Sequence, residues 1–235
     1  MGYQLVLCTQ ENQLSDRDIA KRLETLGLLV SQEEIVSAGT VAVEFLAAVY
    51  RESRIYVMGS NTLRKRVAQT GIKVLSDQEG YSAEVVLIGT DPDVNLTRLS
   101  TAAEAVRRGA KFYVTNLDRG YPLENRIIPS AGSLALAVAF TAGRRPLVLG
   151  KPSQTMANAI RNRLLLPADS IAVIGDQPAQ DMRLGRVLGA TTVLVLSGIT
   201  TPDMYERTRL VSKPDVVLPS IRELPCWLDQ FRQTH

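Results

Sequence analysis

The chain has 235 residues, of which 45% are hydrophobic and 22% charged, a composition typical of a globular protein with one or two domains. Its 27 basic and 24 acidic residues give a net charge of +3, and the absence of any block of about five like charges argues against a nucleic-acid-binding or membrane-surface tail. No apolar run approaches the ~18 residues of a membrane-spanning helix, and no secretory signal pattern is visible. We therefore expect a cytoplasmic protein that binds neither nucleic acid nor membranes.

Histidine and cysteine are too scarce for several kinds of site. The single histidine is His235, the last residue, which excludes histidine general-base catalysis and histidine metal sites unless the terminus takes part. The two cysteines, Cys8 and Cys226, lie far apart in the sequence, so a disulfide scaffold or a structural zinc site is not expected.

Apolar, β-branched runs alternate with helical patterns along the chain. Ser15 and Asp18 form a capping-box pattern, Ile19 and Leu23 share one helical face, and Gly27 suits the left-handed end of that helix. This alternation predicts an α/β fold with parallel sheets. The predicted strands are Gln4–Cys8, Ile55–Met58, Val85–Ile88, Phe112–Val114, Leu147–Leu149, Ile171–Ile174, Thr192–Leu196 and Val216–Leu218.

Polar residues at the ends of predicted strands cluster near Thr9 and within Lys151–Asp181. The segment between these clusters has its own alternation of strands and helices. We therefore predict a discontinuous core domain of residues 1–38 and 145–235, with residues 39–144 inserted as a second domain.

The strongest motif follows the predicted strand Ile171–Ile174. Gly175 permits a tight turn, Asp176 then lies at the carboxyl end of a parallel strand, and Asp181 falls one helical turn later. Carboxylate oxygens in these positions suit Mg²⁺, which binds few carboxylates together with waters and phosphate oxygens. The alternative makes Asp176 a helix N-cap and Asp181 a surface charge.

Lys151 follows the predicted strand Leu147–Leu149 and Gly150 in the same manner. An ammonium group at the end of a strand would balance the charge of a phosphate or carboxylate. Ser153 can cap the helix that follows. A solvated loop lysine is the alternative interpretation of Lys151.

Two further strand ends carry weaker signals. The Thr9 hydroxyl and neighbouring backbone N–H groups, including that of Gln10, could hold a phosphate oxygen in an anion-binding nest, although an ordinary polar turn would look the same. Asn116 and Asp118 follow the predicted strand Phe112–Val114 and are candidates for substrate recognition, with a turn as the alternative.

These stretches, in this order, resemble the haloacid dehalogenase superfamily, and in particular its subfamily IIA of NagD-like and 4-nitrophenylphosphatase-like proteins. Thr9 resembles motif II of that family, Gly150–Ser153 resembles motif III, and Gly175–Asp181 resembles motif IV. The cap region and the last third of the chain also resemble the family, in the stretches Val114–Asp118, Ile128–Ser133, Leu196–Thr201 and Lys213–Val217.

The resemblance implies a Rossmann-like parallel-sheet core, here missing its usual first strand, with an inserted α/β cap of the C2 type. It also implies Mg²⁺-dependent hydrolysis of phosphate monoesters through an aspartyl-phosphate. Thr9 and Lys151 would hold the phosphoryl oxygens, and Asp176 and Asp181 would form the metal site. The substrate in relatives is a small phosphorylated metabolite, and the cap often provides a homodimer contact.

One family motif is missing. Motif I, an Asp-x-Asp sequence at a strand end, should precede motif II, yet only eight residues precede Thr9 and none is aspartate. Asp16 and Asp18 lie at the start of a predicted helix and do not replace it. Glu11 places negative charge where relatives favour neutral residues, which would repel phosphate, and Ala179 occupies a position that is often acidic.

Two accounts of this gap remain open: a shortened polypeptide or misplaced gene start, and a natural loss that leaves a non-catalytic relative. Under either account the chain lacks an aspartate nucleophile in place, so we expect it to be inactive and to bind Mg²⁺ weakly. The alternative function is a non-catalytic phosphate- or metal-binding module, or one that only self-associates. We also expect strands Gln4–Cys8 and Ile171–Ile174 either to pair directly or to leave a gap that another chain fills.

Overall fold

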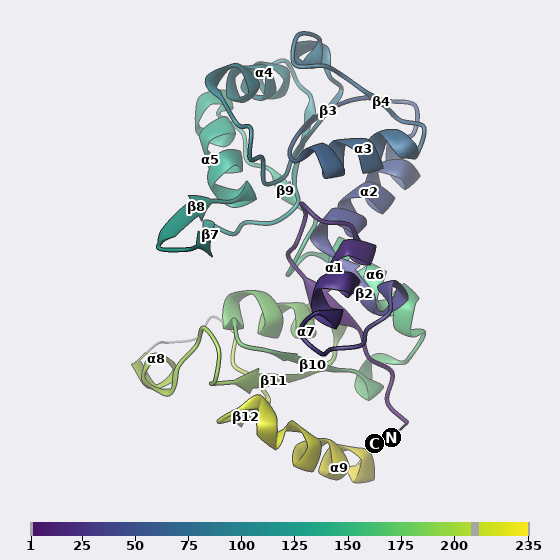
Figure 1. Ribbon diagram of the computed structural model, residues 1–235, viewed down its shortest axis with the longest axis vertical. Coiled ribbons are helices and arrows are strands. Elements are labelled where there is room, and N and C mark those ends of the chain that lie inside the picture. Colours follow the sequence, from purple (N-terminus) through teal and green to yellow (C-terminus); the bar gives the residue numbers. More distant parts are fainter. Residues whose placement is uncertain (1, 208–211, 235) are drawn as a thin grey trace. The chain divides into compact units, whose positions relative to one another are not determined.

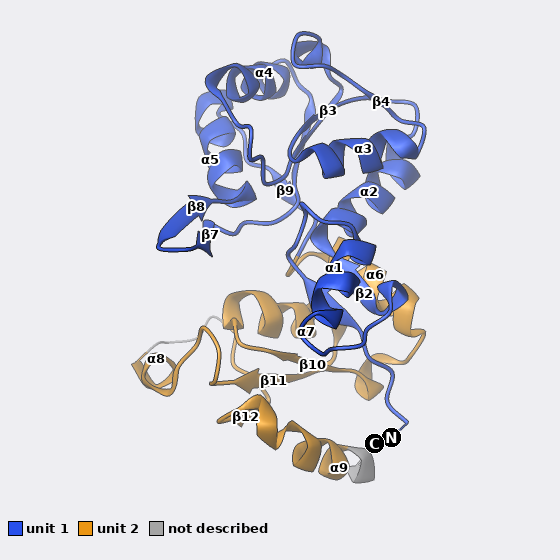
Figure 2. Cartoon of the chain, in the orientation of Figure 1, with its two compact units in different colours: residues 1–150 blue, residues 151–235 orange. Residues whose placement is uncertain are grey.

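The computed structural model describes residues 2–207 and 212–234, so the single histidine, His235, lies outside the described residues. The chain forms two compact units, residues 1–150 (unit 1) and residues 151–235 (unit 2), which Figure 2 shows in different colours. No helix within the described residues combines the length and the apolar character that crossing a membrane requires.

Unit 1 begins with a small parallel pair of strands. Strand β1 (Leu7–Thr9) pairs with β2 (Ile35–Ser37), and helix α1 (Asp16–Glu24) connects them. Ser15 caps the start of α1 as predicted, because its side chain accepts a hydrogen bond from the Asp18 backbone N–H, and its hydroxyl also donates to the Asp18 carboxylate.

The main sheet of unit 1 has five parallel strands in the order β4-β3-β5-β6-β9. Their bounds are β3 Arg54–Met58, β4 Lys73–Val74, β5 Val85–Ile88, β6 Lys111–Val114 and β9 Leu147–Val148. Four helices cover the sheet, with α4 and α5 on one side and α2 and α3 on the other (Figure 1). Their bounds are α2 Ala38–Val49, α3 Asn61–Gln69, α4 Leu96–Arg107 and α5 Ala131–Ala142.

The two faces of this sheet form two separate cores. Along β5, Val86 and Ile88 pack in the α4 and α5 core, while Val85 and Leu87 pack in the α2 and α3 core. Because successive side chains of a strand point to opposite faces, a strand covered on both sides must be apolar throughout. Burial on both faces therefore explains the continuous apolar runs from which these strands were predicted.

Unit 1 also contains an antiparallel hairpin, β7 (Gly120–Leu123) and β8 (Arg126–Pro129), which the sequence did not predict. Both strands contain proline, which weakens the strand signal and is tolerated at an edge. The short strands β2 and β4 were not predicted either, since runs of two or three residues give no clear periodicity.

Unit 2 has a three-stranded parallel sheet in the order β10-β11-β12. The strands are β10 Ala172–Gly175, β11 Thr191–Val195 and β12 Val216–Leu218, and the helices are α6 Gln154–Leu164, α7 Arg183–Leu188, α8 Pro202–Arg207 and α9 Leu224–Thr234. A π-helical turn, Pro178–Met182, precedes α7, and short 3-10 turns occur at Gln32–Glu34, Gly80–Ser82, Ala168–Ser170 and Ile221–Glu223. The predicted cap of α6 is confirmed, because the Ser153 side chain accepts a hydrogen bond from the Met156 backbone N–H.

All the predicted strands are present, with bounds shifted by a few residues at most, and the α/β fold with parallel sheets is confirmed. Strand β9 lies in the range predicted for the core, yet it pairs with β6 in the sheet of unit 1. The assignment of residues 1–38 and 145–235 to one domain stays a prediction.

Within unit 1, β1 pairs with β2, and within unit 2, β10 pairs with β11. Direct pairing of these two strands, β1 and β10, which belong to different units, stays a prediction. Every residue of both strands is half-buried, whereas β5 is fully buried. The other alternative, a gap between these strands that another chain fills, stays a prediction as well.

A buried ionic network joins the elements of unit 1. Arg98 donates from Nη1 to both carboxylate oxygens of Asp91, at 2.9 and 3.0 Å, and from Nε to Asp77 at 3.0 Å. The Tyr56 hydroxyl also donates to Asp77, at 2.9 Å. The Asp91 side chain is fully buried, and this burial raises its pKa even though Arg98 favours the ionised form. Arg98 therefore compensates a carboxylate that has no access to water.

Replacing Arg98 by methionine should lower the free energy of unfolding by about 3–5 kcal/mol, because it leaves the buried Asp91 carboxylate without a counter-ion. Urea unfolding of the full chain followed by far-UV circular dichroism measures this loss. Arg107→Met is the control, since Arg107 pairs with Glu104 on the exposed face of α4 and should cost roughly 0–1 kcal/mol. Equal losses in the two variants would contradict the role assigned to Arg98.

Candidate functional site

The loop after β1 folds around the side chain of Glu11. Oε1 of Glu11 accepts hydrogen bonds from the backbone N–H groups of Asn12, Gln13 and Leu14, at 2.8, 2.6 and 3.3 Å. The Thr9 hydroxyl accepts a hydrogen bond from the Glu11 N–H at 3.2 Å. The loop thus contains a nest of backbone N–H groups of the kind predicted near Thr9. The Glu11 carboxylate occupies this nest.

Asn12 and Asn116 attach this loop to the carboxyl ends of β5 and β6. Oδ1 of Asn12 accepts the Thr90 N–H at 2.7 Å, and Nδ2 of Asn12 donates to the Thr90 hydroxyl at 3.3 Å. Nδ2 of Asn116 donates to the Gln10 carbonyl at 2.7 Å. Asn12, Thr90 and Asn116 are all buried. The structure thus brings together Gln10 and Asn116, two of the predicted site residues.

Asp118 participates in a turn. Its backbone N–H donates to Oδ1 of Asn116 at 3.0 Å, and its carbonyl accepts the N–H of Gly132 at 3.1 Å. A Cβ at Gly132 would lie 2.7 Å from the Asp118 carbonyl oxygen, so the close approach of the two segments requires glycine there. These contacts form the turn that was the alternative interpretation of Asn116 and Asp118, and the substrate-recognition role stays a prediction.

Two Asp-x-Asp sequences occur in unit 1, and in both of them aspartate side chains make contacts that stabilise the fold. Asp16 accepts hydrogen bonds from the hydroxyls of Ser37 and Thr40, at 2.5 and 2.6 Å, while Asp18 belongs to the helix cap. The second sequence, which begins at Asp91 after β5, contributes its first carboxylate to the buried pair with Arg98. Neither sequence has the arrangement expected of a motif I nucleophile.

In unit 2, Lys151 and Asp181 form a buried ion pair. Nζ of Lys151 lies 2.7 Å from Oδ1 of Asp181, and the two side chains are 11% and 7% exposed. The other oxygen, Oδ2, accepts the Gln177 N–H at 3.0 Å. The alternatives of a solvated loop lysine and a surface aspartate are therefore wrong. Asp181 lies in the π-helical turn, a feature that often accompanies functional sites.

Asp176 follows β10 directly and lies beneath the segment Leu196–Thr201. Oδ2 of Asp176 accepts the Ile199 N–H at 2.8 Å, and its carbonyl accepts the Thr200 N–H at 3.3 Å. A Cβ at Gly198 would overlap the Asp176 carboxylate, so glycine is needed where the segment crosses it. The residue that precedes the helical turn is Gln177 and not Asp176, which removes the N-cap alternative.

The carboxylates of unit 2 fit a magnesium ion only in part. No group of three or more histidine, cysteine, aspartate or glutamate side chains gathers within the described residues. Both oxygens of Asp181 already accept hydrogen bonds, from Lys151 and Gln177. Mg²⁺ uses one or two carboxylates and completes its shell with water and phosphate. Asp176 could serve as one such carboxylate ligand. The described residues do not provide a group of three or more side chains that could hold the ion by themselves.

The predicted site residues thus meet as two pairs, Gln10 with Asn116 in unit 1 and Lys151 with Asp181 in unit 2. The convergence of Thr9, Lys151 and Asp176 on one phosphate stays a prediction. Sequence reasoning missed Asn12 and Thr90. Thr90 follows an apolar strand and a glycine, the same pattern that singled out Asp176, so this signal was available.

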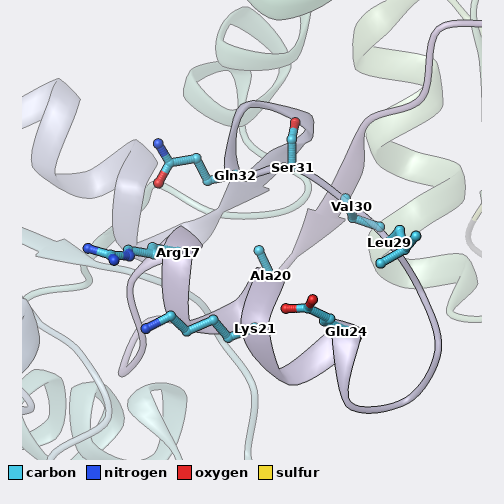
Figure 3. A pocket seen from close by; sticks show the side chains of 8 residues that line it. All are labelled: Arg17, Ala20, Lys21, Glu24, Leu29, Val30, Ser31 and Gln32. Carbon is cyan, nitrogen blue, oxygen red and sulfur yellow. The ribbon is translucent and has the colours of Figure 1, made fainter.

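A separate surface hollow of about 490 Å³ lies along α1, lined by Arg17, Ala20, Lys21, Glu24 and the segment Leu29–Gln32. Figure 3 shows Arg17 and Lys21 extending toward the same side of the helix. Most of the lining residues are exposed, and none is a predicted site residue. The hollow therefore adds nothing to the candidate site.

Comparisons with known proteins bear on the family to which the chain belongs. A family model described as haloacid dehalogenase-like hydrolase matches residues 1–73, and one described as HAD-hydrolase-like matches residues 148–224. A dihydroxyacetone phosphatase of Corynebacterium glutamicum is 31% identical over 229 residues, which cover 97% of this chain and 81% of that protein.

Solved structures are also similar. A p-nitrophenyl phosphatase from Archaeoglobus fulgidus has a TM-score of 0.85 and 30% identity, with 94% of this chain and 84% of that chain covered. NagD from E. coli K-12 has a TM-score of 0.83 and 26% identity, with 93% and 84% covered. These likenesses confirm the fold class predicted from the sequence, and they are consistent with a cap domain.

Replacing Lys151 by methionine should lower the free energy of unfolding by about 3–5 kcal/mol, because the buried Asp181 carboxylate loses its counter-ion. The double variant Lys151→Met/Asp181→Leu should recover most of this loss, since neither charge then remains buried. The fluorescence of Trp227, the only tryptophan, reports urea unfolding of unit 2. Lys213→Met, at an exposed lysine, is the control. A double variant less stable than either single variant would contradict the pairing.

Proposed function

Because the chain belongs to the haloacid dehalogenase-like hydrolases, with likenesses consistent with subfamily IIA, we propose that it binds the phosphate group of a small phosphorylated metabolite. The observation that carries this proposal is the buried Lys151–Asp181 pair, because its Asp181 follows Asp176 closely in the sequence after the end of β10. Relatives in this family are named as phosphatases.

In this proposal Lys151 supplies the positive charge that a phosphate dianion needs. The Asp181 carboxylate holds the Lys151 ammonium in a fixed position, so little side-chain entropy is lost when phosphate binds. The Thr9 hydroxyl and the Gln10 backbone contribute hydrogen bonds to the phosphoryl oxygens. Such fixed donors stabilise an anion better than mobile side chains do.

We propose Asp176 as the carboxylate that contacts Mg²⁺, which when bound would neutralise further charge on the phosphate. With one fitting carboxylate among the described residues, the affinity for Mg²⁺ is expected to be weak. To bind Mg²⁺ as predicted, the Asp181 carboxylate would have to release Lys151 or contact the metal and Lys151 together. Its present hydrogen bonds support a different role, which is to position Lys151.

We further propose that this polypeptide does not form an aspartyl-phosphate and acts as a phosphate-binding module. Covalent catalysis needs a carboxylate held at the end of a strand and aimed at phosphorus. The Asp-x-Asp sequences of unit 1 are engaged by Ser37 and Thr40 in one case and by Arg98 in the other. These contacts support an inactive chain.

Self-association through α5 is a second proposal, and it follows from two exposed apolar side chains. Leu136 and Phe140 lie one turn apart on α5 and are 62% and 95% exposed. Large apolar side chains that share one exposed face are typical of protein interfaces. We propose that this face forms a homodimer.

Inorganic phosphate should raise the melting temperature of the full chain by roughly 5–10 °C at about 100 times the dissociation constant. Lys151→Met should abolish this increment, whereas Lys65→Met, at an exposed lysine of α3, should retain it. Differential scanning fluorimetry with and without phosphate compares the increment within each variant, so a change in basal stability does not interfere. An undiminished increment in Lys151→Met would refute the role of Lys151.

The same protein should release no 4-nitrophenol from 4-nitrophenyl phosphate in the presence of Mg²⁺ above the blank without protein. Robust turnover that falls sharply in Asp176→Ala would instead establish a metal-dependent phosphatase and overturn the proposed inactivity.

Phe140→Asp should convert the dimer to a monomer, because a charge at the centre of an apolar contact is costly to desolvate. Size-exclusion chromatography with multi-angle light scattering measures the mass. Leu96→Asp, at an exposed leucine at the start of α4, is the control and should leave the dimer intact. A monomeric parent chain at high micromolar concentration would rule out the proposed interface.

A further inference from the structure

Three consecutive backbone N–H groups point at one oxygen in the loop after β1. The N–H groups of Asn12, Gln13 and Leu14 lie 2.8, 2.6 and 3.3 Å from Oε1 of Glu11. Successive N–H groups directed at one point form an anion-binding nest, a feature that proteins commonly use for phosphate. Here the anion is a side chain that begins one residue before the nest.

Contacts that do not involve the Glu11 carboxylate also hold the nest in shape. The Glu11 carbonyl accepts the N–H of Gly39 at 3.0 Å, and Asn12 is joined to Thr90 by two hydrogen bonds. The carbonyl of Leu14 accepts a hydrogen bond from Nη1 of Arg66 at 3.3 Å. The backbone is therefore fixed at both ends of the nest by neighbouring elements of unit 1. Removing the carboxylate should leave the N–H groups in place.

The charges around the nest favour an anion there. The Arg66 guanidinium contacts the last carbonyl of the nest and also donates to the Thr40 hydroxyl. The acidic side chain at the start of α1, Asp16, accepts hydrogen bonds from the hydroxyls of Ser37 and Thr40, so its carboxylate is directed toward these two donors. Glu11 itself is half-buried, so the residue that occupies the nest is in part exposed to solvent.

We infer that the N–H groups of Asn12, Gln13 and Leu14 form an oxyanion site, and that Glu11 occupies it as an internal competitor of an external phosphate or phosphate monoester. A phosphate oxygen would take the position of Oε1, and the Glu11 side chain would turn out to solvent. The choice of phosphate as the external oxyanion rests on the proposed function, whereas the nest rests on the hydrogen bonds alone.

The competing explanation is that Glu11 is only a structural cap of its own loop. In that case the loop would lose its order without the carboxylate, and no anion would replace it. The two explanations differ in what happens at the three amides when Glu11 is removed and phosphate is added.

The experiment is a titration of the full chain with inorganic phosphate, followed by the ¹H–¹⁵N NMR signals of the amides of Asn12, Gln13 and Leu14. In Glu11→Ala these signals should shift and saturate at a phosphate concentration lower than in the parent chain. We expect binding tighter by about tenfold or more, equivalent to one charge-assisted hydrogen bond. Glu11→Gln keeps a neutral acceptor in the nest and should give a smaller gain.

Glu34→Ala is the matched control. The Glu34 carboxylate also accepts a backbone N–H, from Ser31 at 2.9 Å, but it faces a single N–H group at the start of a 3-10 turn. This variant should bind phosphate as the parent chain does. A gain as large as that of Glu11→Ala would show a general effect of removing negative charge and would overturn the inference.

Two further results would overturn it. In the first, Glu11→Ala is folded but the signals of its three amides do not shift when phosphate is added. In the second, these signals are lost in Glu11→Ala, and in Glu11→Gln they do not shift with phosphate. The shifts should persist in Glu11→Ala/Lys151→Met, so the nest can be established even where the phosphate role of Lys151 is refuted. The two proposals therefore fail separately.

Discussion

A parallel strand covered on both faces leaves little room for polar side chains, and this constraint influences where many of the polar groups of the protein lie. In unit 1, β5 and β6 are buried along most of their length, and their first buried polar side chains are Thr90 and Thr115, just beyond the strand ends. In unit 2, β10 ends in a glycine followed by Asp176. The polar groups of these three strands are thereby concentrated at the strand ends, where open α/β sheets bind their ligands.

Polar groups buried at these ends must be satisfied, and the same contacts then serve both folding and function. Asn116 satisfies the Gln10 carbonyl, and Lys151 compensates Asp181. Within the described residues, the Thr115 hydroxyl is the buried side-chain group that has no hydrogen-bond partner. A structural and a functional interpretation of such residues therefore do not exclude each other, because an ion pair that stabilises unit 2 also fixes the ammonium that a phosphate would contact.

The fold was largely predictable because its signals are local. Apolar β-branched runs identified the strands, and the caps at Ser15 and Ser153 follow from residue spacing within one helical turn. The strand β2 and the hairpin were missed because three-residue runs and proline-containing strands carry little periodicity. The pairing partner of β9 was not predictable either, since register and neighbour depend on contacts between residues far apart in the sequence.

The site was predictable as a list of residues but not as a set of contacts. The strand–glycine–polar pattern singled out Asp176 and Lys151, yet the 30-residue separation of Lys151 and Asp181 contains no sign that they pair. The negative charge of Glu11 was recognised as unfavourable for phosphate. That its carboxylate would lie within the nest depends on the backbone path of four residues, which no spacing rule gives.

The position of Glu11 also has an evolutionary consequence. Glutamate codons differ from those of glutamine and alanine by one base, so a single point mutation would exchange the carboxylate in the nest for a neutral group. The surrounding backbone is held by Gly39, Thr90 and Arg66 and would not need to change. Phosphate affinity in this lineage can therefore be gained or lost at one codon, without remodelling of the fold.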